Sequence, residues 1–79
     1  MLEFKVLLNM IEDAKKFVSI ASKYNMDIIA RNPKSIYEVD ASSIMGMFSL
    51  DLSDPIIITT NNDGDGRKFK TEVEKYIVH

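Results

Sequence analysis

The hydrophobic and polar positions of the chain alternate from its first residues onward. Apolar residues occupy every second position from Leu2 to Leu8, and Glu3 and Lys5 lie between them. A period of two is typical of a β-strand with one face in the core. The pattern therefore predicts a strand over residues 2–8.

A helical pattern follows this strand. Apolar residues recur at steps of three and four, while lysines and serines fill the other face. Asn9 can accept a hydrogen bond from the amide of Glu12, whose carboxylate can reach back as in a capping box. Asp13 adds favourable charge to the first turn. We therefore predict an amphipathic helix over residues 10–24, capped by Asn9.

Two short apolar runs surround the next turn. The first covers residues 26–31, and the second places Ile36 and Val39 among polar and aromatic neighbours. Between them lies Asn32-Pro33-Lys34, and proline after asparagine is suited to a turn. This arrangement predicts a hairpin of two strands with an exposed connection near residues 32–34.

A short second helix is predicted over residues 43–50. Ile44, Met47 and Phe48 keep helical spacing there. Gly46 weakens the helix by about 1 kcal/mol relative to alanine.

The last third of the chain contains one strand and one helix. Residues 56–60 are β-branched throughout and predict a buried strand. Residues 61–66 are rich in asparagine, aspartate and glycine and predict a loop. The spacing of Phe69, Val73 and Tyr76 predicts a C-terminal helix that packs one face on the sheet.

The predicted order of elements indicates an α+β fold. Strand, helix, strand, strand, helix, strand, helix implies a four-stranded, mostly antiparallel sheet covered on one side by three helices. A chain of 79 residues leaves room for one core, so we expect a single domain over residues 1–79.

Composition excludes several classes of protein. The chain is 46% hydrophobic and 28% charged, which is enough to bury a core. It contains no cysteine, which excludes disulfides and thiolate metal sites and favours a cytoplasmic location. A net charge of −2 has the wrong sign for a broad nucleic-acid surface. No apolar stretch is long enough for a signal peptide or a membrane span, so we expect no membrane association.

The sequence offers little for catalysis. Its one histidine is His79 at the end of the chain, so no Ser/His/Asp or Cys/His set can form. The possible oxygen ligands Asn62, Asp63, Asp65 and Glu72 lack the ligand spacing of a calcium loop. We therefore expect neither an enzyme nor a bound metal or cofactor.

Two segments carry a resemblance to a known family. Residues 43–50, Ser-Ile-Met-Gly-Met-Phe-Ser-Leu, resemble the regulatory-serine segment of HPr, the histidine-containing phosphocarrier protein of the bacterial sugar phosphotransferase system. Residues 21–24, Ala-Ser-Lys-Tyr, are similar to the end of that family's first helix. The resemblance implies the HPr-like open-faced β-sandwich.

The active-centre loop differs from the family pattern. The family has G-I/L-H-A-R-P-A at the start of the first helix, and an ungapped count back from Ala21 puts Met10 at the histidine position. Glu12 and Asp13 stand where the arginine and proline would be. A thioether cannot accept a phosphoryl group as an imidazole does, and two carboxylates repel phosphate. The comparison predicts a degenerate active centre.

The resemblance also marks a regulatory site and a docking surface. Ser43 matches the serine that a dedicated kinase phosphorylates in the family, and its simpler interpretation is a helix cap. The matching docking residues are Ile44, Met45, Met47 and Phe48. Because a helix of two turns cannot bury all four, at least one methionine should be exposed, and we expect Met47.

Three functional hypotheses remain open at this stage. The first is a non-catalytic regulatory or docking module that binds phosphotransferase-system proteins or a serine kinase through the second helix. The second is a working phosphocarrier with an atypical acceptor. The third is a small α+β domain that forms homodimers and has no connection to phosphotransfer. The sequence leaves the oligomeric state and the partner undetermined.

Overall fold

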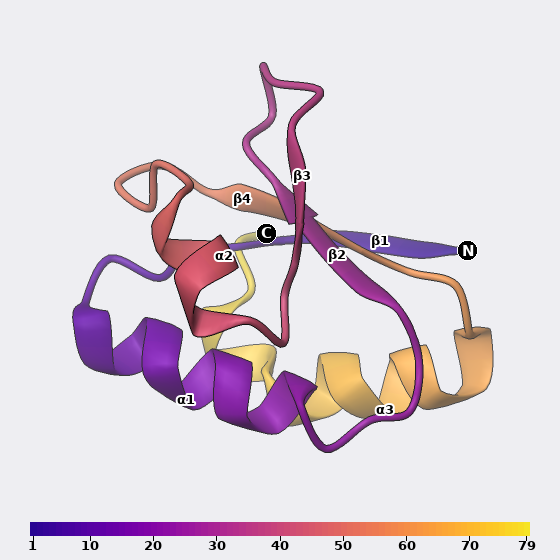
Figure 1. Ribbon diagram of the computed structural model, residues 1–79. Helices are drawn as coiled ribbons and strands as arrows, with labels where there is room; N and C mark the ends of the chain where they lie inside the picture. Colours follow the sequence, from indigo (N-terminus) through magenta and orange to yellow (C-terminus); the bar gives the residue numbers. More distant parts are fainter.

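The computed structural model describes residues 1–79 and contains four strands and three α-helices (Figure 1). In chain order the elements are β1 (Leu2–Val6), α1 (Ile11–Ala21), β2 (Ile28–Arg31), β3 (Glu38–Asp40), α2 (Ile44–Phe48), β4 (Ile56–Thr60) and α3 (Asp63–Glu72), followed by the 3₁₀-helix η1 (Glu74–Tyr76). This is the order that the sequence predicted. No helix is both long and apolar enough to cross a membrane.

The strands form one sheet in the spatial order β1-β4-β2-β3. All three strand pairs are antiparallel, and β4 lies between β1 and β2. The predicted hairpin is present, with Ala30 opposite Val39. In Figure 1, α1 and α3 run side by side across one face of this sheet.

The core lies between that face and the helices. Ile56, Ile58 and Thr60 of β4 point into it, because every second residue of a strand faces the same side. Phe17 of α1 and Phe69 of α3 meet in a T-shaped contact with ring centroids 5.4 Å apart. Each of these aromatic side chains is fully buried, and such burial stabilises a fold by about 1.5–3 kcal/mol per side chain.

The predicted cap of α1 is wrong. Met10, not Asn9, occupies the N-cap position, with extended backbone angles (φ −118°, ψ 143°), and no side chain caps the helix. Because the helix begins one residue later than the capping box requires, Asn9 lies one position too early to reach the Glu12 amide. The helix also ends earlier than predicted, at Ala21, where the chain enters a turn.

The predicted loop at residues 61–66 is also wrong in part. The chain enters α3 at Asp63, because the Asn62 side chain accepts a hydrogen bond from the Asp65 amide at 3.0 Å and caps the helix. Carboxylates in the first turn add favourable charge next to the helix N-terminus. Together these effects offset the low helix propensity of Gly64 and Gly66.

The end of the chain pairs with β1 instead of extending the helix. The Leu7 amide donates to the Tyr76 carbonyl at 2.9 Å, and the Val78 amide donates to the Lys5 carbonyl at 3.0 Å. The C-terminal segment therefore runs antiparallel along part of the free edge of β1. The predicted C-terminal helix does not continue through this segment, since Tyr76 ends the 3₁₀-helix η1 and Ile77 is extended.

A tyrosine–carboxylate pair joins the C-terminal end of α1 to α3. The Tyr24 hydroxyl donates to the Glu72 carboxylate, and the Tyr24 ring packs against Phe69 with centroids 5.6 Å apart. This hydrogen bond, with smaller effects of burial and nearby negative charge, raises the pKa of Tyr24 to about 12.

Gly66 is predicted to be essential for the packing of α3. A Cβ there would lie 2.5 Å from the Thr60 hydroxyl oxygen, so Gly66→Ala should lower the free energy of unfolding by about 1–3 kcal/mol through overpacking. Urea denaturation measures this. Gly64→Ala is the matched control in the same helix, because the nearest atom to its Cβ, on Asn62, is 3.6 Å away. This control should keep or slightly raise stability, and equal destabilisation by both variants would contradict the packing argument.

The Tyr24–Glu72 pair predicts a pH dependence at alkaline pH. Because the folded-state pKa of Tyr24 is raised from 10.0 to about 12, the stability from this pair is complete below pH 10 and is lost as the pH rises towards 12. The difference in ultraviolet absorbance between the wild type and Tyr24→Phe reports the titration of this phenol. Glu72→Gln should move the pKa back towards 10, and an unchanged pKa in that variant would exclude Glu72 as the main cause.

Candidate functional site

The beginning of α1 presents two apolar side chains to solvent. Met10 is 63% exposed and Ile11 is 66% exposed. The first amides of any helix lack partners within the helix and can bind an anion. Here Glu12 and Asp13 already place two carboxylates in that first turn. The charge of this end of α1 therefore opposes a bound phosphate.

A hollow of about 390 Å³ lies beside the start of α1. It is lined by Leu7, Asn9, Asp13, Lys75, Tyr76, Ile77 and Val78. Lys75 is its one cationic residue, and the Lys75 ammonium lies 5.2 Å from the Tyr76 ring centroid. One lysine beside the Asp13 carboxylate does not make a strongly positive anion site.

The one histidine does not join this region. Because the C-terminal segment runs antiparallel to β1, His79 follows Val78 away from the β1–α1 connection. The structure thus brings Met10, Glu12 and Asp13 together at the start of α1 and leaves His79 beside β1. No group of three or more His, Asp or Glu side chains is placed to hold a metal ion.

Ser43 is the N-cap of α2, as predicted. Its backbone is extended (φ −103°, ψ 117°), and its hydroxyl oxygen accepts a hydrogen bond from the Gly46 amide at 3.2 Å. The preceding turn is fixed by the Asp40 carboxylate, which accepts from the Ser42 amide at 2.9 Å and the Ser42 hydroxyl at 2.6 Å. The Ser43 side chain remains partly accessible.

Gly46 explains how so short a helix lies close to the sheet. A Cβ at this position would be 3.2 Å from the Val39 Cβ and 3.4 Å from the Asp40 carbonyl oxygen, both tight contacts. A glycine therefore lets α2 pack against β3. The helix propensity lost at Gly46 is offset by this close packing.

The predicted exposure of Met47 is wrong. Met47 is fully buried, whereas Met45 is 79% exposed and Phe48 is 43% exposed. Residues two apart on a helix point in nearly opposite directions, so when Met47 packs into the core Met45 must face solvent. Ile44 is partly buried against the core. The expectation that at least one methionine is exposed is therefore met by Met45.

Sequence reasoning missed Tyr37 beside this helix. Tyr37 is 56% exposed, and its hydroxyl oxygen lies 3.5 Å from the Ser49 hydroxyl oxygen at the end of α2. The hairpin fold brings these two residues together, and no local pattern in the sequence signals the contact. Tyr37 adds an aromatic ring beside the exposed side of α2.

The exposed apolar residues form what we call the α1–α2 face: Met10, Ile11, Met45 and Phe48. The two helices contact each other, and in Figure 1 α2 lies beside the middle of α1. Four of the eight large apolar side chains that are exposed on this chain belong to this face. Exposed apolar side chains on two neighbouring helices are typical of a surface that contacts a partner.

A profile of a known family, described as "PTS HPr component phosphorylation site", matches residues 11–76, from the start of α1 to the end of η1. The chain belongs to the HPr family. The match includes the Ser43–Leu50 segment that carried the resemblance in the sequence.

Solved structures of the HPr family share the fold. HPr-C-His from Thermoanaerobacter tengcongensis matches with a TM-score of 0.73 and 24% identity, over 92% of this chain and 90% of that one. Phosphocarrier protein HPr from Bacillus anthracis str. Ames matches with a TM-score of 0.72 and 24% identity, over 98% and 96%. No curated protein matches the sequence. The predicted HPr-like open-faced sandwich is therefore confirmed.

Proposed function

We propose that this HPr-family protein is a non-catalytic docking module of the phosphotransferase system that cannot carry phosphohistidine. The observation that carries the proposal is the composition of the start of α1, where Met10, Glu12 and Asp13 stand and none of the first residues is a histidine. We place its action in the cytoplasm, where proteins of that system that have no membrane span are found.

The chemistry of phosphate transfer supports this proposal. A carrier needs an imidazole nitrogen that forms a labile phosphoramidate, and it needs cations or free amides that hold the doubly charged group. Met10 has no nucleophilic nitrogen or oxygen in its side chain. Glu12 and Asp13 would meet the incoming phosphate with like charge.

The α1–α2 face supports a docking role. Its methionines are unbranched and polarisable, which suits a surface that adapts to a partner. Ser43 stands at the N-cap of the helix that presents Met45. A phosphate on Ser43 would add about −1.5 to −2 charge beside this apolar face and would oppose binding of an apolar or acidic partner.

The first test is phosphoryl transfer. Incubation with phosphoenolpyruvate and the upstream phosphotransferase enzyme should leave the chain without acid-labile phosphate, because no imidazole stands at the start of α1. An HPr protein that carries the active-centre histidine is the positive control. Labelling that survives His79→Ala would reveal an atypical acceptor, and labelling lost in that variant would identify His79 itself. Either outcome would overturn the proposal.

The second test is docking through the α1–α2 face. Met45→Lys should weaken binding to phosphotransferase-system proteins at least tenfold, because it places a charge in the centre of the contact, and Ser43→Asp should weaken it to a smaller degree. Surface plasmon resonance measures both. Ile36→Lys is the matched control, since Ile36 is 99% exposed on the β2–β3 connection and lies outside this face. Unchanged binding of folded Met45→Lys protein would exclude this face, and concentration-dependent dimers lost in Met45→Lys would point to self-association instead.

A further inference from the structure

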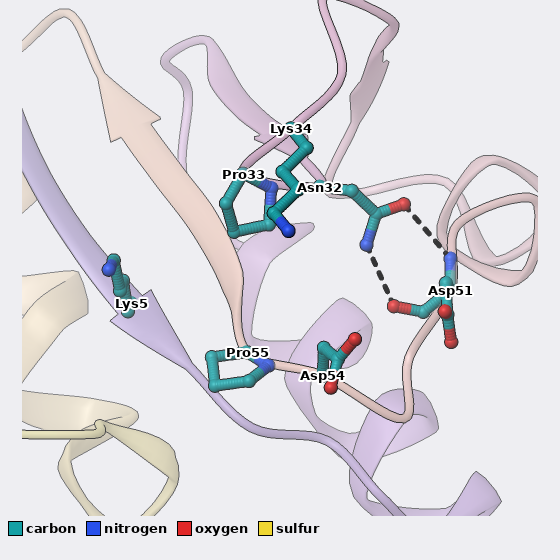
Figure 2. Close-up of a pocket in the computed structure, with 7 residues that line it drawn as sticks. All are labelled: Lys5, Asn32, Pro33, Lys34, Asp51, Asp54 and Pro55. Carbon is teal, nitrogen blue, oxygen red and sulfur yellow. Dashed lines mark hydrogen bonds between the residues drawn. The ribbon is translucent and has the colours of Figure 1, made fainter.

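A second hollow has a volume of about 480 Å³, and none of the residues that line it belongs to the α1–α2 face. It is lined by Lys5, Asn32, Pro33, Lys34, Asp51, Asp54 and Pro55 (Figure 2). Lys5 alternates with the buried residues Phe4 and Val6 along β1, so its side chain is on the face of the sheet that no helix covers. The volume lies within the range of about 300–1,000 Å³ typical of small-molecule sites.

Hydrogen bonds join the two loops that line this hollow, residues 32–34 and residues 51–55. The Asn32 side chain donates from Nδ2 to the Asp51 carbonyl at 2.8 Å and accepts at Oδ1 from the Asp51 amide at 3.0 Å (Figure 2). Arg31 braces the β2–β3 loop by donating to the carbonyls of Pro33 at 3.3 Å and Ser35 at 3.4 Å. The hollow is therefore held in shape before any ligand binds.

One of the two carboxylates that line the hollow already accepts hydrogen bonds from a neighbouring residue. The Asp51 carboxylate accepts hydrogen bonds from the Ser53 amide and hydroxyl, and these hydrogen bonds lower the pKa of Asp51. Figure 2 shows this carboxylate turned away from the space between the two loops. Asp54 makes no such bond and remains free to bind a ligand.

Three charged side chains around the hollow have no partner. Lys5, Lys34 and Asp54 are exposed, and the one ion pair of the chain joins the N-terminal amine to Asp63. In Figure 2, Lys34 and Pro33 lie on one side of the hollow, and Asp54 and Pro55 lie on the other. Opposite charges thus border one space without neutralising each other.

We propose that this hollow binds a small zwitterion of the free amino-acid class. Its carboxylate bonds to the Lys34 ammonium with support from Lys5, and its ammonium bonds to the Asp54 carboxylate. The aliphatic part lies between the rings of Pro33 and Pro55, which lose no side-chain entropy on binding. A simple anion would be repelled by Asp54 and a simple cation by the two lysines, so a ligand with both charges is the complementary one.

Binding to this site is weak, with a dissociation constant on the order of millimolar, because the three charged side chains are exposed and screened by solvent. Nuclear magnetic resonance titration of the ¹⁵N-labelled full chain suits this range. L-alanine, L-leucine and L-glutamine are the probes, and the Asn32 side-chain amide and the Asp51 backbone amide are the reporters. At least one probe should cause saturable shifts at both reporters.

Blocked analogues separate the two charges of the ligand. The carboxamide of the best probe keeps only the ammonium, and its N-acetyl derivative keeps only the carboxylate. Each should bind at least tenfold more weakly than the free amino acid. An analogue that binds as tightly as the parent would overturn the zwitterion assignment, and shifts that stay linear for all three probes would overturn the site.

Matched variants test the two charged sides of the hollow. Lys34→Ala and Asp54→Ala should each weaken binding at least fivefold, with the rest of the spectrum unchanged. Lys68→Ala is the control, because Lys68 is also an exposed lysine but lies on α3 outside the hollow. Equal weakening by the control would show a general charge effect and contradict the proposal, as would wild-type affinity in both hollow variants.

Discussion

Helices cover the sheet on one face only, and the positions of both proposed sites depend on that asymmetry. β4 lies between β1 and β2 and sends Ile56 and Ile58 into the core beneath the helices. On the open face, Ile57 is still only 7% exposed, because it pairs directly with Lys5 and Arg31, whose aliphatic stems flank it. The covered side therefore carries the apolar α1–α2 face, and the open side carries the charged hollow.

The α1–α2 face exists because α2 cannot stabilise itself. A helix of five residues is marginal in water, so α2 depends on its tertiary contacts. Met47 supplies them by full burial, Gly46 permits the close approach to β3, and Ser43 caps the first turn. Fixing the helix in this rotation forces Met45 outward. The surface available to a partner is thus a consequence of the packing that holds the helix.

Local sequence patterns predicted the helices and strands of this fold. The features that these patterns did not predict depend on contacts between residues far apart in the sequence. The alternation in β1, the β-branched run of β4 and the Ser43 cap are properties of neighbouring residues, so the sequence revealed them. The orientation of α2 about its own axis buries Met47. It depends on packing against the core, which no local sequence pattern describes. The same holds for the contact of Tyr37 with Ser49 and for the pairing of residues 76–78 with β1, each of which joins distant parts of the chain.

The first turn of α1 links stability to the function we propose. The free amides and the dipole at a helix N-terminus favour negative charge, whether a bound anion or a side chain supplies it. In this chain Glu12 and Asp13 supply that charge permanently. Since no side chain caps α1, these carboxylates are the main local source of compensation for its N-terminus. The residues that stabilise the helix start are therefore the same ones that, in the function we propose, oppose a phosphate there. If that proposal holds, a variant with a phosphate site at this position would have to lose that stabilisation as well as gain a histidine.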